Sequence, residues 1–545
     1  MKKYVLLAAA MSAALMITGC GKKEMPQKYQ QLLADKSGSY VKLGFYGAPE
    51  QIDPVKAPEY NHDQMFSNLV FAAPLRKLQD GSYSPYLFES FETSLDGEQV
   101  VVNAKWRQNL KWHDGKDFDP TEFDYTVAQM LSTEKNSPYA AAAKGIVSMN
   151  NTMEGVEIRF AGNSIKYMDM LCVGLIPGHI LDEKNIASGT TVKATYDSFM
   201  EKPVGLGPYK VVENEKHKYY QLEPDVNFFD GKGASRPKLV IASSYELQQS
   251  ISDFREGLFD WIDIPSIVGE QLQNLGVENV IYMQYPNPAV AAWVFNTKNE
   301  KLQDIRIRKA LNLIMDRSCV KQYLGPDSTE LFDNLIPVGG EDKTLENAYE
   351  EGVKLLTEAG VVDNNNDGIR EYNGSAFKLK IMINDDNMTR RMIAEKMIDK
   401  LKEAGIAAEV EAVSWTDFVA GRLKAGNYDT ALLSYHIADN CSLKALFSTK
   451  QPDDAESLNF TGISDAELDA DLAALDRIVC NEDKAVIYER VNKKISQLCP
   501  CAFLVRPSNL ALVHGDNIAT MKAKTAYWND IFNWKLMFGP QDSKL

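Results

Sequence analysis

The fold is decided by residues 390–413, RRMIAEKMIDKLKEAGIAAEVEAV, which join a helix to a strand. From Ile393 to Leu401, apolar residues recur every four positions on one helix face, and Gly405 stands where the helix is expected to end. The segment then alternates into a strand, and residues 428–433 (YDTALL) form another one. A helix followed by a strand, in succession, is typical of a doubly wound α/β domain.

The chain before this domain shows other patterns. Residues 40–135 combine short strands, Asp-Gly turns and one helix that begins after Pro120, which predicts an α+β region. Residues 203–209, PVGLGPY, open a further region, and hairpin strands follow them. A nucleotide-binding loop is disfavoured there, because no third glycine opens a helix and Pro208 interrupts the segment.

Size and charge restrict the class of protein. A length of 545 residues allows roughly three or four domains, enough to enclose a large ligand cleft. The net charge is −16, and no long basic run occurs. This balance disfavours binding to nucleic acids or to anionic lipid surfaces.

The N-terminal segment has the pattern of a secretory signal. Lys2 and Lys3 precede a short apolar stretch that closes at Cys20 with Ile-Thr-Gly-Cys. This ending resembles a bacterial lipobox, in which the cysteine thiol receives a lipid. We therefore expect a lipoprotein signal peptide over residues 1–20 and a polar tether over 21–39. The alternative is an ordinary signal peptide with a coincidental cysteine.

Several short motifs, in order along the chain, resemble one known family. They are Ile52-Asp53-Pro54, Trp112-His113-Asp114-Gly115, the segment 203–209, Phe295-Asn296-Thr297 and Asp316-Arg317. Together they are similar to family 5 of the extracytoplasmic solute-binding proteins of ABC importers, which bind oligopeptides, dipeptides or nickel complexes. The resemblance covers about residues 41–515.

The resemblance implies a type II periplasmic-binding-protein-like fold, with two α/β lobes joined by a hinge and an extra α+β lobe. Lobe I would comprise three separate segments, lobe II would be an insertion into lobe I, and lobe III would close against lobe I around the ligand. The expected boundaries are residues 40–69, 203–287 and 511–545 for lobe I, 70–202 for lobe II, and 288–510 for lobe III.

The resemblance also implies a residue for the peptide terminus. In peptide-binding members, an aspartate in the loop after one strand pairs with the free α-amino group of the ligand, and Asp439 is the matching position here. A buried ammonium needs such a partner, because an unpaired buried charge costs several kcal/mol. Without the resemblance, Asp439 would be interpreted as a residue that caps its own loop. The family usually has Gly-Trp before this loop, where this chain has Ser434-Tyr435.

Other residues are weaker candidates for ligand contact. Arg390 and Arg391 begin a helix where some dipeptide binders place an arginine against the ligand carboxylate, although a solvated helix face explains them as well. Tyr435, Trp415 and Trp293 are candidates for aromatic pocket walls, and core packing is the alternative for each.

Residues 363–368, DNNNDG, resemble the beginning of a calcium loop. Asp363, Asn365 and Asp367 supply oxygen ligands at alternate positions, but position 12 is Gly374 and not glutamate. The sequence therefore predicts at most a low-affinity structural calcium site, and a polar surface turn is the alternative. We expect no other cofactor.

No catalytic motif supports an enzyme, since neither His-Glu-x-x-His nor Gly-x-Ser-x-Gly occurs. We predict a lipid-anchored receptor outside the cytoplasm that captures short peptides by hinge closure and delivers them to an ABC permease. We expect it to act as a monomer and not to bind nucleic acid. The alternatives are the same scaffold with a nickel chelate or an oligosaccharide, and a surface lipoprotein enzyme such as a peptidase or glycosidase.

Overall fold

The computed structural model divides the chain into two compact units, residues 1–39 and 40–545. It describes residues 27–35, 40–46, 52–56, 61–78, 82–135, 137–182, 184, 192–215, 218–231, 236–244, 247–265, 280–286, 289–324, 329–331, 348–436, 443–450 and 457–514. In the first unit, α2 (Gln27–Ala34) is helical, so part of the predicted tether has regular structure. Cys20, the predicted lipidation residue, lies outside the described residues.

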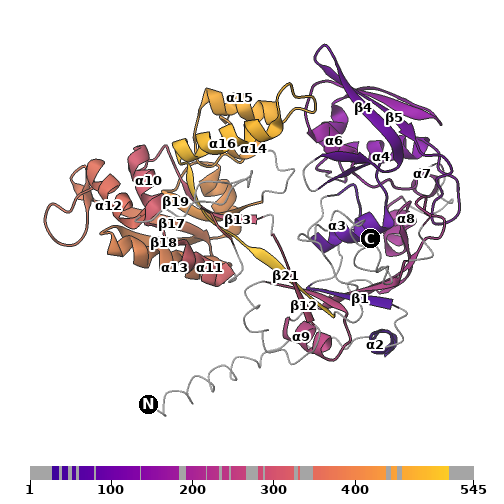
Figure 1. The fold of residues 1–545 in the computed structure, drawn as a ribbon, viewed down its shortest axis with the longest axis horizontal. Coiled ribbons are helices and arrows are strands. Elements are labelled where there is room, and N and C mark those ends of the chain that lie inside the picture. Colours follow the sequence, from indigo (N-terminus) through magenta and orange to yellow (C-terminus); the bar gives the residue numbers. More distant parts are fainter. Residues whose placement is uncertain are drawn as a thin grey trace, which may run out of the picture. The chain divides into compact units, whose positions relative to one another are not determined.

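A seven-stranded mixed sheet occupies the segments expected for lobe I, in the order β12-β21-β11-β1-β10-β9-β8 (Figure 1). β21 begins at Ser508, slightly before the expected boundary at 511. Two of the helices in these segments are α3 (Asn61–Val70) and α9 (Leu247–Arg255). The strands are β1 (Tyr40–Tyr46), β8 (Tyr209–Glu215), β9 (Tyr219–Pro224), β10 (Lys238–Ser244), β11 (Trp261–Pro265), β12 (Val280–Pro286) and β21 (Ser508–His514).

The segment expected for lobe II contains a four-stranded antiparallel sheet, in the order β4-β5-β7-β6, and the separate hairpin β2-β3. Its strands are β2 (Leu75–Lys77), β3 (Tyr83–Pro85), β4 (Phe88–Asp96), β5 (Gln99–Trp106), β6 (Ile146–Asn151) and β7 (Gly155–Phe160). Its helices include α4 (Thr121–Leu131), α5 (Ala140–Lys144), α6 (Lys166–Met170), α7 (Gly178–Leu181) and α8 (Val192–Glu201).

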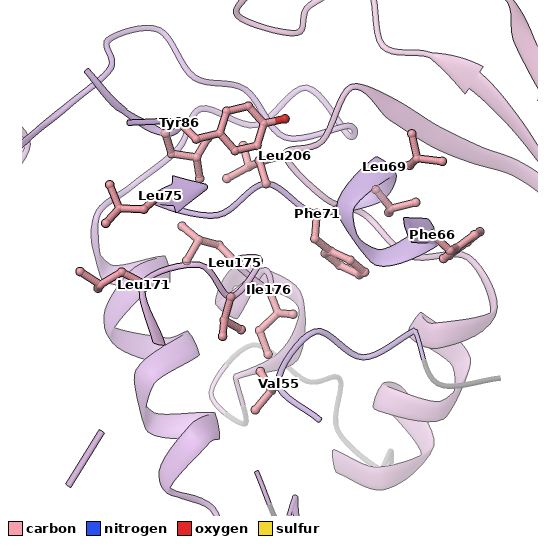
Figure 2. Close-up of a cluster of buried hydrophobic side chains, with 14 of the residues drawn as sticks. Val55, Phe66, Leu69, Phe71, Leu75, Tyr86, Leu171, Leu175, Ile176 and Leu206 are labelled. Carbon is pink, nitrogen blue, oxygen red and sulfur yellow. The ribbon is translucent and has the colours of Figure 1, made fainter. Parts of the chain in front are cut away.

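Lobes I and II share one hydrophobic core. Figure 2 shows a part of it, in which Val55, Phe66 and Leu206 from lobe I lie in the same cluster as Leu75 and Ile176 from lobe II. All these side chains are nearly inaccessible to solvent. Burying a side chain of this size stabilises a fold by about 1.5–3 kcal/mol. Separating lobe I from lobe II would expose many of them at once, so the two lobes form one rigid part.

Lobe III has a six-stranded sheet of its own, in the order β14-β20-β13-β19-β17-β18 (Figure 1). Its strands are β13 (Ala289–Phe295), β14 (Thr329–Glu330), β17 (Lys378–Asn384), β18 (Ala407–Val413), β19 (Thr430–His436) and β20 (Cys501–Arg506), and a small hairpin joins β15 (Glu371–Tyr372) to β16 (Ser375–Ala376). Its helices include α10 (Ile305–Ile314), α11 (Arg317–Leu324), α12 (Ala348–Glu358), α13 (Met388–Glu403), the π-helix η4 (Asp417–Leu423), α14 (Leu443–Phe447), α15 (Ala466–Leu475) and α16 (Lys484–Leu498).

Helices cover both faces of this sheet. On the central strand β13, Trp293 and its alternate neighbours pack in a cluster with α10, α12 and α13. The intervening residues, such as Ala292, pack in a second cluster with η4 and α14 to α16. This arrangement, with parallel pairing of β17 to β18 and β19, is the doubly wound sheet that the sequence predicted.

Local signals explain where these elements begin and end. The side chain of Asp304 caps α10 by accepting a hydrogen bond from the N–H of Arg306. Asn387 caps α13 in the same way, and Gly405 follows the helix with φ +75°. β18 starts directly afterwards at Ala407.

The motif Trp112-His113-Asp114-Gly115 joins lobe II to the glycine-rich segment of lobe I. His113 Nδ1 accepts a hydrogen bond from the N–H of Gly205 at 3.1 Å, and its Nε2 lies 2.9 Å from the carbonyl oxygen of Gly207. A Cβ atom on Gly205 would lie 1.9 Å from the carbonyl oxygen of Val70, and one on Gly207 would lie 2.4 Å from that of Leu69. Both positions require glycine because the backbone passes so close to α3.

These partners fix the tautomer of His113. Nδ1 carries no proton because it accepts from Gly205, and Nε2–H donates to Gly207. Burial lowers the pKa of His113, although the hydrogen bond to Gly207 opposes the shift. A catalytic interpretation of the motif has no support, since both ring nitrogens serve the packing of lobe II on lobe I.

We predict that this histidine makes folding sensitive to mild acid. The unfolded chain takes up a proton on His113 below about pH 6.5, whereas the folded chain resists it, so the contribution is complete above that pH and is lost as the pH falls. His113→Gln keeps an acceptor and a donor but does not titrate. Urea unfolding at pH 7.5 and pH 5 should show a smaller loss of stability on acidification for the variant than for the unmodified protein. Equal losses in both proteins would contradict the assignment.

Candidate functional site

The carboxyl ends of several strands meet at one edge of the lobe III sheet. β17 runs parallel to β18 and β19, so Asn384, Val413 and His436 end their strands at the same edge. His436 pairs with Ala289, the first residue of β13, because β13 runs in the opposite direction. We call this boundary the lobe III edge.

The chain enters and leaves lobe III at this same edge. β12 of lobe I ends at Pro286, opposite Ser508, where β21 begins. Along the chain, β13 follows β12 after residues 287–288, and β21 follows β20 after residue 507. We call these two connections between lobe I and lobe III the crossovers. In lobe I, the carboxyl ends of β1, β10, β11 and β12 lie at the edge from which these crossovers leave. Open α/β sheets bind ligands outside the carboxyl ends of their strands, so this is the candidate site.

Arg390 provides a fixed positive charge at the lobe III edge. Its guanidinium donates a short hydrogen bond to Oδ1 of Asn384, the last residue of β17. The amide of Asn384 in turn donates to the carboxylate of Asp386. Burial lowers the pKa of Arg390, and Asp386 opposes the shift. The guanidinium is held in place by its neighbours and does not lie on an open helix face.

Arg391 occupies a different position in the helix. Its backbone N–H donates to the carbonyl oxygen of Asn387 at 3.0 Å, as in a first helical turn, and its side chain is half-buried. The structure shows no contact for its guanidinium within the described residues. Ligand contact by either arginine remains a prediction.

Exposed apolar side chains gather on the loops of the same edge. Trp415 follows β18 and is 56% exposed, and its indole stacks on Phe418 with ring centres 5.9 Å apart. Met388 and Met392, in the first turns of α13, are 63% and 36% exposed. A large exposed indole is uncommon on a surface that contacts nothing, and it offers an apolar wall to a ligand. Ligand contact by Trp415 remains a prediction.

The two other aromatic candidates lie in the core. Trp293 is fully buried in the middle of β13, with its ring 5.0 Å from that of Phe295. Tyr435 is buried against Phe447 at a ring distance of 5.8 Å, and burial raises its pKa well above the usual value. The structure places both side chains in packing positions, so we do not include them in the site.

Asp439 lies outside the described residues. β19 ends at His436, and the described chain resumes with α14 at Leu443. In the sequence, Asp439 stands three residues after His436, where β19 ends. Its contact with a ligand remains a prediction.

The calcium-like loop brings three carboxylates together. Asp363, Asp367 and Glu371 each offer an oxygen atom, and these atoms lie within 4.8 Å of one another. Oδ1 of Asp363 is buried and accepts no hydrogen bond, while Oδ2 accepts from the N–H of Gly368 at 3.0 Å. Asn365 donates its amide to Asp367 at 3.0 Å, and its Oδ1 accepts a hydrogen bond from the N–H of Asp367 at 2.9 Å.

Glu371 and Asn384 were not predicted as site residues from the sequence. Glu371 stands at position 9 of the loop and not at position 12, where a glutamate was sought. The hairpin of β15 and β16 turns it back, so that it also accepts a hydrogen bond from the N–H of Asn364 at 2.7 Å. Asn384 ends an apolar strand in a run of polar residues, which was a usable signal.

Comparisons with known proteins agree with this architecture. The family model for bacterial extracellular solute-binding proteins, family 5 middle, matches residues 82–452. The oligopeptide-binding protein AppA of Bacillus subtilis is 22% identical over 529 residues, which cover 93% of each chain. Its structure in complex with a nonapeptide is similar with a TM-score of 0.64 at 20% identity, covering 92% of this chain and 99% of that one.

A second solved structure has a similar fold. NikZ from Campylobacter jejuni, in complex with Ni(L-His), gives a TM-score of 0.68 at 22% identity and covers 92% of this chain and 100% of its own. These similarities confirm the type II binding-protein fold. Because the family model covers more than half of the sequence, the chain belongs to family 5 of the bacterial extracellular solute-binding proteins.

Proposed function

We propose that this solute-binding protein captures short peptides and delivers them to an ABC permease. The observation that carries the proposal is the lobe III edge, where the fixed guanidinium of Arg390 and the exposed indole of Trp415 flank the ends of parallel strands. A free peptide has a carboxylate, an ammonium group and variable side chains. Arginine suits the carboxylate, and an indole accepts varied apolar side chains.

Asp439 would supply the third element, a negative charge for the peptide ammonium. Together, an acidic and a basic group at one edge would recognise the two ends of a zwitterionic ligand and leave its side chains to apolar contacts. Closing lobe III over the ligand would remove these charges from water and strengthen their attraction. No covalent step is needed for this function.

A metal chelate is the second candidate for the ligand. NikZ has a similar fold and was solved with Ni(L-His). Native mass spectrometry of the purified protein distinguishes the two, because a retained peptide and a retained nickel chelate differ in mass and isotope pattern. An enzyme would instead release an altered substrate.

The charge on Asp439 can be tested directly. We predict that Asp439→Asn weakens binding of a free peptide by about 3 kcal/mol, roughly a hundredfold, because the ammonium loses its counter-charge. N-acetylation of the peptide should weaken binding to the unmodified protein by a similar factor and have little further effect on the variant. Calorimetry with a peptide identified by native mass spectrometry measures both.

Asp385→Asn is the matched control, since Asp385 is exposed and lies directly after β17 at the same edge. This variant should bind as the unmodified protein does. Equal affinity of the unmodified protein for free and acetylated peptide would remove Asp439 from the site.

We also propose a lipid anchor at Cys20. Among the described residues, no helix is long and apolar enough to span a bilayer. A lipid on Cys20 would hold the protein at the outer side of the cell membrane, on a linker that contains α2. We predict that Cys20→Ser moves the protein from the membrane fraction to the soluble fraction without changing its unfolding temperature. Mass spectrometry should find a lipid on the unmodified N-terminal peptide, and an unlipidated membrane-bound protein would contradict the proposal.

Finally, we propose that the loop from Asp363 to Glu371 binds calcium weakly, because three carboxylates converge there and one oxygen is buried without a donor. If the Kd is on the order of 1 mM, 10 mM CaCl₂ should stabilise the fold by about 1.4 kcal/mol. Asp363→Asn should abolish this gain, whereas Asp117→Asn, at an exposed site in lobe II, should retain it. Chemical unfolding with CaCl₂ or with EDTA measures the difference. A gain that persists in Asp363→Asn would exclude this loop.

A further inference from the structure

Besides the crossovers, two loops from lobe II and lobe III contact each other through hydrogen bonds. One joins β7 to α6 in lobe II, and the other joins α15 to α16 in lobe III. The backbone N–H of Ile165 donates to the carbonyl oxygen of Asp476 at 2.7 Å. The hydroxyl of Ser164 donates to Oδ2 of Asp476 at 3.4 Å. We call these two loops, residues 161–165 and 476–483, the clasp.

Asn163 makes the largest share of the contacts. Its Oδ1 accepts hydrogen bonds from the N–H groups of Ile478 and Val479, at 2.8 and 3.1 Å. Its Nδ2 donates to the carbonyl oxygen of Val479 at 3.0 Å. One side chain of lobe II thus satisfies three backbone groups of lobe III, in a manner that depends on both functions of the amide.

Apolar and charged groups extend the contact. The side chain of Ile478 packs against the core that lobes I and II share, although it belongs to lobe III. In lobe II, Lys77 binds Asp169 at 2.6 Å, and Lys77 is nearly buried. Lys484, at the start of α16, interacts electrostatically with both of them, and its pKa is lowered chiefly by burial. An apolar side chain of lobe III and charged groups of both lobes thus accompany the hydrogen bonds of the clasp.

The separate hydrophobic cores indicate how the clasp would respond to a hinge motion. Lobes I and II share one core, whereas lobe III has two clusters of its own on the faces of its sheet. Along the sequence, the chain passes between these two bodies after β12 and again after β20. Bending at the crossovers would move lobe III as a body and would break the clasp before disturbing either core.

We propose that the clasp forms when the lobes close and sets the balance between the open and closed states. This inference rests on the proposed capture by hinge closure and identifies residues, other than the proposed ligand contacts, that stabilise the closed form. A ligand that binds the closed state gains affinity in proportion to its population. Asn163 would tune affinity without touching the ligand.

Hydrogen exchange of the full chain, as purified, tests the clasp without any added peptide. In the unmodified protein, we expect protection of the amides of Ile165, Ile478 and Val479. Asn163→Ala should raise exchange at least about tenfold in both loops, although the two are more than 300 residues apart, because it removes three hydrogen bonds. Exchange in β7 and α15 should not change. Asn163→Asp retains the acceptor and loses the donor, so it should have an intermediate effect.

Asn103→Ala is the matched control, since Asn103 is an exposed asparagine on β5 of the same lobe. It should exchange as the unmodified protein does. Faster exchange of Asn163→Ala in residues 161–165 alone, or unprotected loops in the unmodified protein, would overturn the clasp. A protein that retains no peptide but shows coupled exchange of the two loops would overturn the proposed ligand and leave the clasp intact.

Discussion

Two antiparallel strand pairs, one in lobe I and one in lobe III, hold the ends of the two crossovers next to each other, and the position of the candidate site depends on them. Pro286 pairs with Ser508 between β12 and β21 in lobe I, and β13 pairs with β20 in lobe III. Each pair is antiparallel, so both crossovers connect the same edge of the lobe I sheet to the same edge of the lobe III sheet. Backbone hydrogen bonds hold both pairs together, with a register shift in β13 between Ala291 and Ala292.

This constraint determines where a ligand can be recognised. At the lobe III edge, parallel strands end together, and Arg390 in the first turn of α13 and Trp415 after β18 lie beyond their ends. At the lobe I edge, β1, β10 and β11 end together in the same way. A ligand held at both edges would contact two bodies with separate cores. Part of its binding free energy would then stabilise one relative orientation of the two bodies.

The sequence predicted the elements whose signals are local. Helix α13 ends before Gly405 and strand β18 follows it, as predicted for residues 390–413, because periodicity and helix termination depend on neighbouring residues. The exposures of Trp415 and Trp293 were not predictable in this way. Both tryptophans adjoin or lie in strands, and their exposure depends on tertiary packing: helices α10 and α13 cover Trp293, whereas Trp415 stacks on Phe418 of η4 and stays 56% exposed.

The polar clusters show the same limit. The glycines at 205 and 207 suggested special backbone angles, but the reason for them is the close passage of α3, which comes from a distant segment. Likewise, His179 lies between Glu122 at 2.7 Å and Asp114 at 3.0 Å, an arrangement that could suggest acid–base catalysis. Its carboxylate partner Glu122 also accepts from the N–H groups of Gly178 and His179. The cluster joins α4 to α7, so its saturated hydrogen bonds indicate a structural role.

The separate cores and the clasp together affect the free-energy difference between the open and closed states. A receptor that is always closed would admit its ligand slowly, and one that is always open would spend part of the binding energy on closure. Contacts such as those of Asn163 contribute about 1 kcal/mol each, small compared with either core. They can shift the balance between the two states severalfold without affecting the fold. The hydrophobic cores thus determine which bodies move, and a few hydrogen bonds determine how readily they close.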